Sequence, residues 1–346
     1  MRRPKLIHNI FFWIVLGFLS TFFAETFSGS SPDFLFKTFG YFGIIPIYLL
    51  HSVLLAAIVI RRGKPFSLRS LYFVSLLFGM YEAYITKVLW SPTWNEGFWH
   101  IAGMAVAETS LLVFFWHAVF SFLLPLFWLE SLSIPTPRLP ALLPEKWRAW
   151  LVGLRGAILT GLVGGIMAGS AIASPPQAFV ILLADSLALS LLVFLFRLAN
   201  RKEGFNLSAL LPRRGEVIVL AALLFLVYLF FGLFLRRDVH PGVVGHAAVL
   251  VMYAGFLALL FLSLRKDRSL PEVGDNMPVA SPGYTPRHWL ALCASLTLSG
   301  TLVGFLPVDL RALLAGFIYL VCTGTGVMLF FVALDSLFRR PSKRES

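Results

Sequence analysis

Residues 215–235 read GEVIVLAALLFLVYLFFGLFL, a run of 21 residues whose single charge is Glu216. A pair of arginines stands on each side of it, Arg213–Arg214 and Arg236–Arg237. An α-helix needs about 20 apolar residues to cross the hydrocarbon core of a bilayer. The length and the flanking charges therefore predict a transmembrane helix, and the same criterion can be applied along the whole chain.

Apolar runs of this kind recur throughout the 346 residues. The chain is 58% hydrophobic and 13% charged, with a mean hydropathy of +0.82, whereas soluble domains carry about 25% charged residues. We predict an all-α, polytopic transmembrane helical bundle with about ten spans. The predicted spans are 8–25, 41–60, 68–89, 108–129, 148–171, 177–197, 215–235, 243–264, 288–306 and 311–337.

The basic residues indicate the orientation of these spans. With the N-terminus inside, ten crossings place 24 of the 29 Lys and Arg residues on the cytoplasmic side or near it, as the positive-inside rule requires. The five on the outer side are Lys37, Lys87, Arg236, Arg237 and Arg311. We therefore expect a cell-membrane protein with both termini in the cytoplasm and membrane lipids as its surroundings. We interpret the first apolar run as an uncleaved helix, because it continues into Glu25 without a clear cleavage site.

The net charge of +12 does not indicate nucleic-acid binding, because the basic residues form short clusters between the apolar runs. Cys293 and Cys322 lie inside apolar runs and are expected to be small buried side chains.

Two halves are expected. Residues 1–132 contain four spans with ionisable residues, and residues 147–346 contain six spans that we expect to act mainly as a scaffold. In the fifth span Gly161, Gly165 and Gly169 recur every four residues, which favours close contact with a neighbouring helix.

Ionisable residues at membrane depth are costly and mark candidate functional sites. At 1.5 Å per residue, Glu25, His51, Glu82, Glu108 and His117 all fall in the outer half of the first four spans. We predict an outward-facing Glu/His site there.

Helical angles rank these residues. Glu82 and Thr86 share one stripe, and His117 and Ser121 share another. Glu82 and His117 are therefore the predicted central pair. Glu25, His51, Lys87, Thr86, Ser121 and Glu108 are the predicted supporting polar residues. Glu108 stands nine residues before His117, which places the two on opposite faces of a straight helix, so that both can face one site only if the helix bends.

The segment Glu82-Ala83-Tyr84-Ile85-Thr86-Lys87 resembles the EExxxR motif of the CPBP family of intramembrane proteases. That resemblance implies that Glu82 is the water-activating glutamate and that His117 is the histidine of the second motif. Ala83 and Lys87 depart from the motif, Val113 replaces the Phe of the FxxxH pattern, and the third motif is absent.

A broader stretch, 12–130, is similar to a group of uncharacterised prokaryotic polytopic membrane proteins. The matching segments are Ala24-Glu25 with Ser28-Gly29-Ser30, Tyr81-Glu82 with Thr86-Lys87 and Pro92-Thr93-Trp94, and His117 with Ser121, Leu124-Pro125 and Glu130. This similarity implies a functional first half and no particular activity.

Three functions remain open from the sequence. The leading hypothesis is a CPBP-like intramembrane hydrolase acting on a membrane-embedded peptide or small molecule, with Glu82 as general base and a divalent metal as an optional cofactor. The alternatives are a proton- or cation-coupled transporter that uses the same groups, and a lipid-modifying membrane enzyme. Asp185, His246 and Tyr253 are further polar residues within predicted spans, and we expect structural roles for them.

Overall fold

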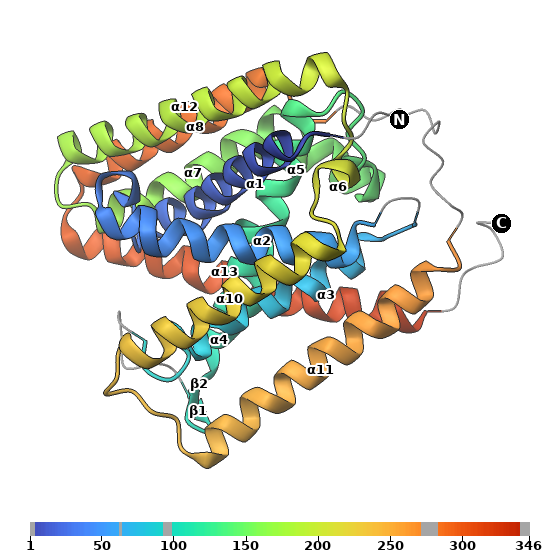
Figure 1. Ribbon diagram of the computed structural model, residues 1–346. Coiled ribbons are helices and arrows are strands. Elements are labelled where there is room, and N and C mark those ends of the chain that lie inside the picture. Colours follow the sequence, from blue (N-terminus) through green and yellow to red (C-terminus); the bar gives the residue numbers. More distant parts are fainter. Residues whose placement is uncertain (1–3, 62–63, 93–98, 271–282, 340–346) are drawn as a thin grey trace.

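Long helices make up almost all of the structure, as the apolar runs predict (Figure 1). The computed structural model describes residues 4–61, 64–92, 99–270 and 283–339. In these ranges strands occur only as a short hairpin, in which β1 (His100–Ile101) pairs antiparallel with β2 (Met104–Ala105). The predicted all-α helical bundle is confirmed.

The first half contains the following elements, in chain order. They are α1 (Leu6–Thr21), the π-helix η1 (Phe22–Thr26), the 3₁₀ turn η2 (Phe34–Phe36), the π-helix η3 (Gly40–Ile44), α2 (Ile45–Val59), α3 (Leu68–Gly79), the 3₁₀ helix η4 (Met80–Ala83), α4 (Val106–Leu111), the π-helix η5 (Leu112–Leu123) and α5 (Leu124–Ser133).

The second half is more regular. Its elements are the 3₁₀ turn η6 (Leu139–Leu142), α6 (Glu145–Leu151), α7 (Leu154–Ala171), α8 (Pro175–Glu203), α9 (Leu207–Leu210), α10 (Arg214–Phe234), α11 (Val243–Asp267), α12 (Pro286–Gly304) and α13 (Val308–Phe338).

Eight helical segments in the described part of the chain are long and apolar enough to cross a bilayer. They include every predicted span except the third and the ninth, where α3 and α12 stand. A polytopic membrane protein is therefore confirmed, while the count of ten spans and the cytoplasmic location of the termini stay predictions. Helix α1 begins and α13 ends at the same end of the bundle, which we call the terminal end; the opposite end is the far end (Figure 1).

Two predicted spans have different limits in the structure. The predicted span 68–89 is wrong at its C-terminal side: the α-helix ends at Gly79, tightens into η4 and then turns, so that Lys87 adopts a left-handed conformation with φ +58°. The predicted span 148–171 is interrupted between α6 and α7, because Gly153 is extended, with ψ −179°.

The first half forms the centre of the bundle. About two thirds of the apolar window is buried in the spans of α1, α2 and α4–α5, against 6% in α10. Leu226, Phe230 and Leu233 of α10 are exposed, as expected of a helix whose solvent is lipid. One apolar cluster includes residues of both halves, and the division into a functional half and a scaffold half stays a prediction.

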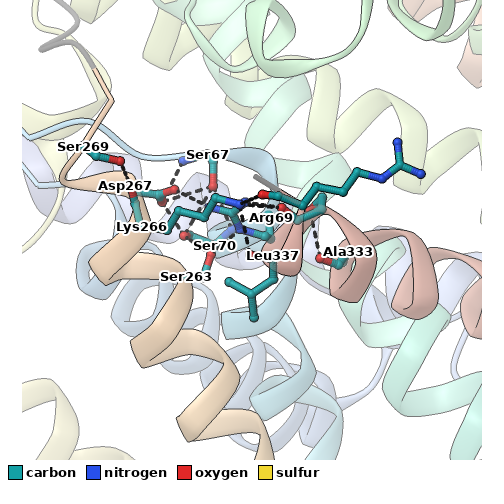
Figure 2. Close-up of polar contacts among 11 residues, drawn as sticks. Ser67, Arg69, Ser70, Ser263, Lys266, Asp267, Ser269, Ala333 and Leu337 are labelled. Carbon is teal, nitrogen blue, oxygen red and sulfur yellow. Dashed lines mark hydrogen bonds and ion pairs between the residues drawn. The ribbon is translucent and has the colours of Figure 1, made fainter. Parts of the chain in front are cut away.

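At the terminal end, a partly buried polar cluster joins α3, α11 and α13 (Figure 2). Arg69 Nη2 forms an ion pair with Asp267 Oδ1 at 2.9 Å, and Ser67 and Ser70 donate to the other carboxylate oxygen of Asp267. Lys266 Nζ donates to the carbonyl oxygens of Ser336, Leu337 and Arg339, which closes the C-terminal turn of α13. The cluster fixes the ends of three helices that are far apart in the sequence.

The predicted glycine stripe contacts a neighbouring helix, which is α12. A Cβ atom on Gly165 would lie 2.0 Å from Ser299 Oγ and 2.4 Å from the Leu296 carbonyl oxygen, and Gly161 and Gly169 are equally close to α12. Small residues let two helix backbones approach in this way.

Replacing Gly165 with Ala should therefore destabilise the protein, by about 1–3 kcal/mol for an overpacked contact. Gly316→Ala in α13 is the matched control, because no atom lies within 4 Å of its added Cβ. Thermal unfolding of the purified protein in detergent should show a lower midpoint temperature for Gly165→Ala than for the wild type. The midpoint of Gly316→Ala should not be lowered. Equal midpoints would contradict the packing role of Gly165.

Candidate functional site

Most candidate polar residues lie where the backbone departs from the α-helical repeat. Glu25 is in the π-helix η1, Glu82 is in the 3₁₀ helix η4, and His117 and Ser121 are in the π-helix η5. Mid-helix 3₁₀ and π segments are uncommon and occur often at functional sites. These three irregular helices lie in separate parts of the sequence, and all of them contribute side chains to one region near the far end.

Glu82 and His117 form the predicted central pair. Glu82 Oε1 and His117 Nε2 are 2.9 Å apart, and both side chains are buried. His117 Nδ1 is hydrogen-bonded to Ser121 Oγ at 2.9 Å, and Thr86 Oγ1 donates to Glu82 Oε2. Both ring nitrogens and both carboxylate oxygens therefore have a partner, which holds the pair in one geometry.

A glycine explains how the two helices approach closely enough for this bond. Gly79 ends α3 three residues before Glu82, and a Cβ atom there would lie 2.6 Å from Val113 Cα of η5. The absence of a side chain lets the backbone of α3 pack directly on the helix that carries His117.

A second hydrogen-bonded chain begins at the half-exposed Glu25. Ser30 Oγ donates to Glu25 Oε2, and Tyr48 Oη donates to Glu25 Oε1 at 2.7 Å. Tyr48 Oη and Tyr81 Oη are 3.0 Å apart. The Tyr81 ring stands edge-on to the His117 ring, with centroids 4.9 Å apart. The chain thus leads from the Ser28–Ser30 segment to the Glu82–His117 pair.

His51 lies on the other side of the pair. Its Nδ1 donates to the Ile47 carbonyl oxygen at 2.8 Å, so that in a neutral ring Nε2 accepts from the Tyr228 hydroxyl at 3.1 Å. The Phe78 ring stacks on the His51 ring and also on the His117 ring, at centroid distances of 4.8 and 5.6 Å. Phe78 therefore spaces the two histidines.

Two predicted supporting residues have other contacts. Lys87 Nζ donates to the Arg236 carbonyl oxygen at 2.9 Å, and Arg236 Nη1 donates to the Thr86 and Ser91 carbonyl oxygens. Lys87 therefore links the turn that follows η4 to the connection between α10 and α11. Glu108 is buried in the first turn of α4. It takes no part in the hydrogen bonds that join Glu82, Thr86, His117 and Ser121.

Residues expected to be structural have protein partners. Thr26 Oγ1 donates to Asp185 Oδ2 at 2.9 Å, which ties η1 to α8. The His246 ring stacks on Tyr84, with Nδ1 3.4 Å from the Tyr84 hydroxyl. Cys293 and Cys322 are buried free thiols, as predicted.

Three tyrosines of the site were not predicted from the sequence: Tyr48, Tyr81 and Tyr228. Tyr48 stands three residues before His51, on the same face of α2, and Tyr81 is adjacent to Glu82. The helical stripe would have identified Tyr48. Tyr228 had no such signal, because its place beside His51 depends on how α10 packs against α2.

Among the described residues, no group of three His, Cys, Asp or Glu side chains is arranged to hold a metal ion. Glu82 and His117 supply two such ligands. The divalent metal considered from the sequence stays a prediction.

The comparisons with known proteins agree with this architecture. A family model described as an uncharacterized membrane protein family matches residues 14–340. The chain belongs to this family. An uncharacterized protein of Archaeoglobus fulgidus is 28% identical over 321 residues, which cover 93% of this chain and 98% of that protein. No solved structure matches the chain.

Membership in this family confirms the predicted similarity to uncharacterised polytopic membrane proteins and the multi-pass membrane location. The resemblance to CPBP proteases and the cell membrane as the location stay predictions.

Gly79→Ala tests the contact that brings the central pair together. The added methyl group meets backbone rather than a flexible side chain, so α3 and η5 must separate and the Glu82–His117 hydrogen bond should lengthen. We expect a loss of stability of about 1–3 kcal/mol and a shift in the ¹⁵N NMR signals of the His117 ring. Gly324→Ala in α13, where no atom lies within 4 Å of the added Cβ, should change neither. Unchanged ¹⁵N signals in Gly79→Ala would show that the pair does not depend on this contact.

Proposed function

We propose that this chain is a membrane-embedded hydrolase in which the Glu82–His117 pair activates water. The observation that carries the proposal is the 2.9 Å hydrogen bond between a buried carboxylate and a buried imidazole. General acid–base catalysis requires a positioned side chain within hydrogen-bond reach of the proton that it abstracts, and the bond to His117 fixes the position of Glu82.

The chemistry assigns each group a step. Each carboxylate oxygen accepts more than one hydrogen bond, so Glu82 can hold a water molecule and still keep His117 and Thr86 as partners. The water O–H bond breaks as its proton passes to Glu82, and the water oxygen bonds to the carbonyl carbon of the substrate. The bond to the leaving group then breaks, and the leaving group takes a proton from the pair. Ser121 orients the His117 ring.

The surroundings favour a membrane-bound substrate. The pair lies among apolar side chains near the C-terminal end of α3, and the half-exposed Ser28–Ser30 segment is joined to it through Glu25, Tyr48 and Tyr81. A membrane-embedded peptide or a small amphiphile would present a carbonyl group at this depth.

Glu82→Gln should abolish hydrolysis while keeping the size of the side chain. We expect a loss of at least 100-fold, within the range measured for general acid–base groups, when fluorogenic membrane peptides and lipid esters are screened in proteoliposomes. Asp185→Asn is the matched control, because Asp185 is also a buried carboxylate inside a span but bonds to Thr26 instead. Equal activity of wild type and Glu82→Gln on a substrate that is cleaved would remove Glu82 from the mechanism.

The hydrogen-bonded chain favours a second candidate function, a proton-coupled transporter. Ser30, Glu25, Tyr48 and Tyr81 are consecutive groups able to pass a proton toward the buried pair. In proteoliposomes Tyr48→Phe should then reduce proton-driven uptake at least 10-fold, because it removes the hydroxyl between Glu25 and Tyr81. Tyr41→Phe, whose hydroxyl bonds only to the Leu35 carbonyl oxygen in the described structure, is the control. Uptake independent of the proton gradient would count against transport.

A further inference from the structure

A cavity of about 870 Å³ lies at the terminal end, away from the Glu82–His117 pair. It is formed by the C-terminal end of α2, the connection from α8 to α10 and the first turn of α10, which lie side by side in Figure 1. Pro4, just before α1, also lines it. The volume is in the range of cavities that bind small molecules and cofactors.

The polar lining of this cavity is mainly cationic. Arg61, Lys64, Arg213 and Arg214 contribute positive charges, and Glu203 contributes the negative charge among the described lining residues. None of the four cations forms an ion pair with a carboxylate of the described chain, whereas Arg69 nearby in the sequence is paired with Asp267. The positive charge is therefore available to an anion.

Asn206 and Ser208 add uncharged polar groups, and much of the rest of the lining is apolar and adjoins the lipid-facing surface. Ala57 and Ile58 of α2 line it, together with Val217 and Ile218 of α10. Ile218 is 70% exposed, and the whole of α10 is the least buried of the spanning helices. One side of the cavity thus continues into the surface that the acyl chains of the bilayer cover.

We propose that this cavity binds the anionic headgroup of a membrane phospholipid, with the acyl chains lying against α10. Unpaired cations next to an apolar wall match both parts of such a lipid. Basic pockets between transmembrane helices at the cytoplasmic side, where this end is predicted to lie, are suited to anionic headgroups. A free phosphate would use the cations and leave the apolar wall without a partner.

The test measures lipid binding to the full-length protein purified in detergent. Native mass spectrometry should show saturable binding of dioleoyl-phosphatidylglycerol and at least 10-fold weaker binding of dioleoyl-phosphatidylcholine. The double variant Arg213→Gln/Arg214→Gln should weaken phosphatidylglycerol binding about 10-fold or more. Arg61→Gln/Lys64→Gln removes the cations on the other side of the cavity and should do the same, so the test does not depend on one variant folding.

The matched control is Arg201→Gln/Lys202→Gln, which removes two cations at the end of α8 that do not line the cavity. It should leave phosphatidylglycerol binding unchanged. Equal losses in the control and cavity variants would show general charge attraction and overturn the proposal. Inorganic phosphate that binds as tightly as phosphatidylglycerol, and loses affinity in the same variants, would identify a free-anion site and also overturn it.

Discussion

Polar groups inside a bilayer must find their partners within the protein, and the rest of this structure depends on that constraint. The α-helix satisfies the backbone, but it leaves a buried Glu or His side chain without a partner. In the described structure Glu82 bonds to His117 and Thr86, and His117 bonds to Ser121. Polar side chains that would be unfavourable to bury alone are thereby hydrogen-bonded to one another.

The same constraint explains why the site is built on irregular helices. A π-helix has more residues per turn than an α-helix, and a 3₁₀ helix has fewer. Both therefore change the direction of the side chains that they carry. In this way η4 and η5 can direct Glu82 and His117 toward each other. The absent side chain of Gly79 and the flat ring of Phe78 then set how close the helices approach. The packing of these helices therefore also determines the geometry of the Glu82–His117 hydrogen bond.

The helices and the central pair were predictable because they follow from distances along the chain. Apolar length located the spans, and depth with helical angle selected Glu82 and His117 from the other ionisable residues. The contacts that the sequence did not indicate depend on distances between elements. The partner of Lys87 depends on the position of Arg236, and Tyr228 reaches His51 only through the packing of α10. Hydropathy contains no information on either contact.

The ion pair at the terminal end has a consequence for biosynthesis. Arg69 and Asp267 are separated by 198 residues, which a ribosome adds in about 10–40 s at 5–20 residues per second. Helix α3 is therefore synthesised well before its partner exists. Arg69, in the first turn of α3, must wait through this interval for the carboxylate of Asp267. The ion pair can form only after α11 has been made, so this contact belongs to a late step of assembly.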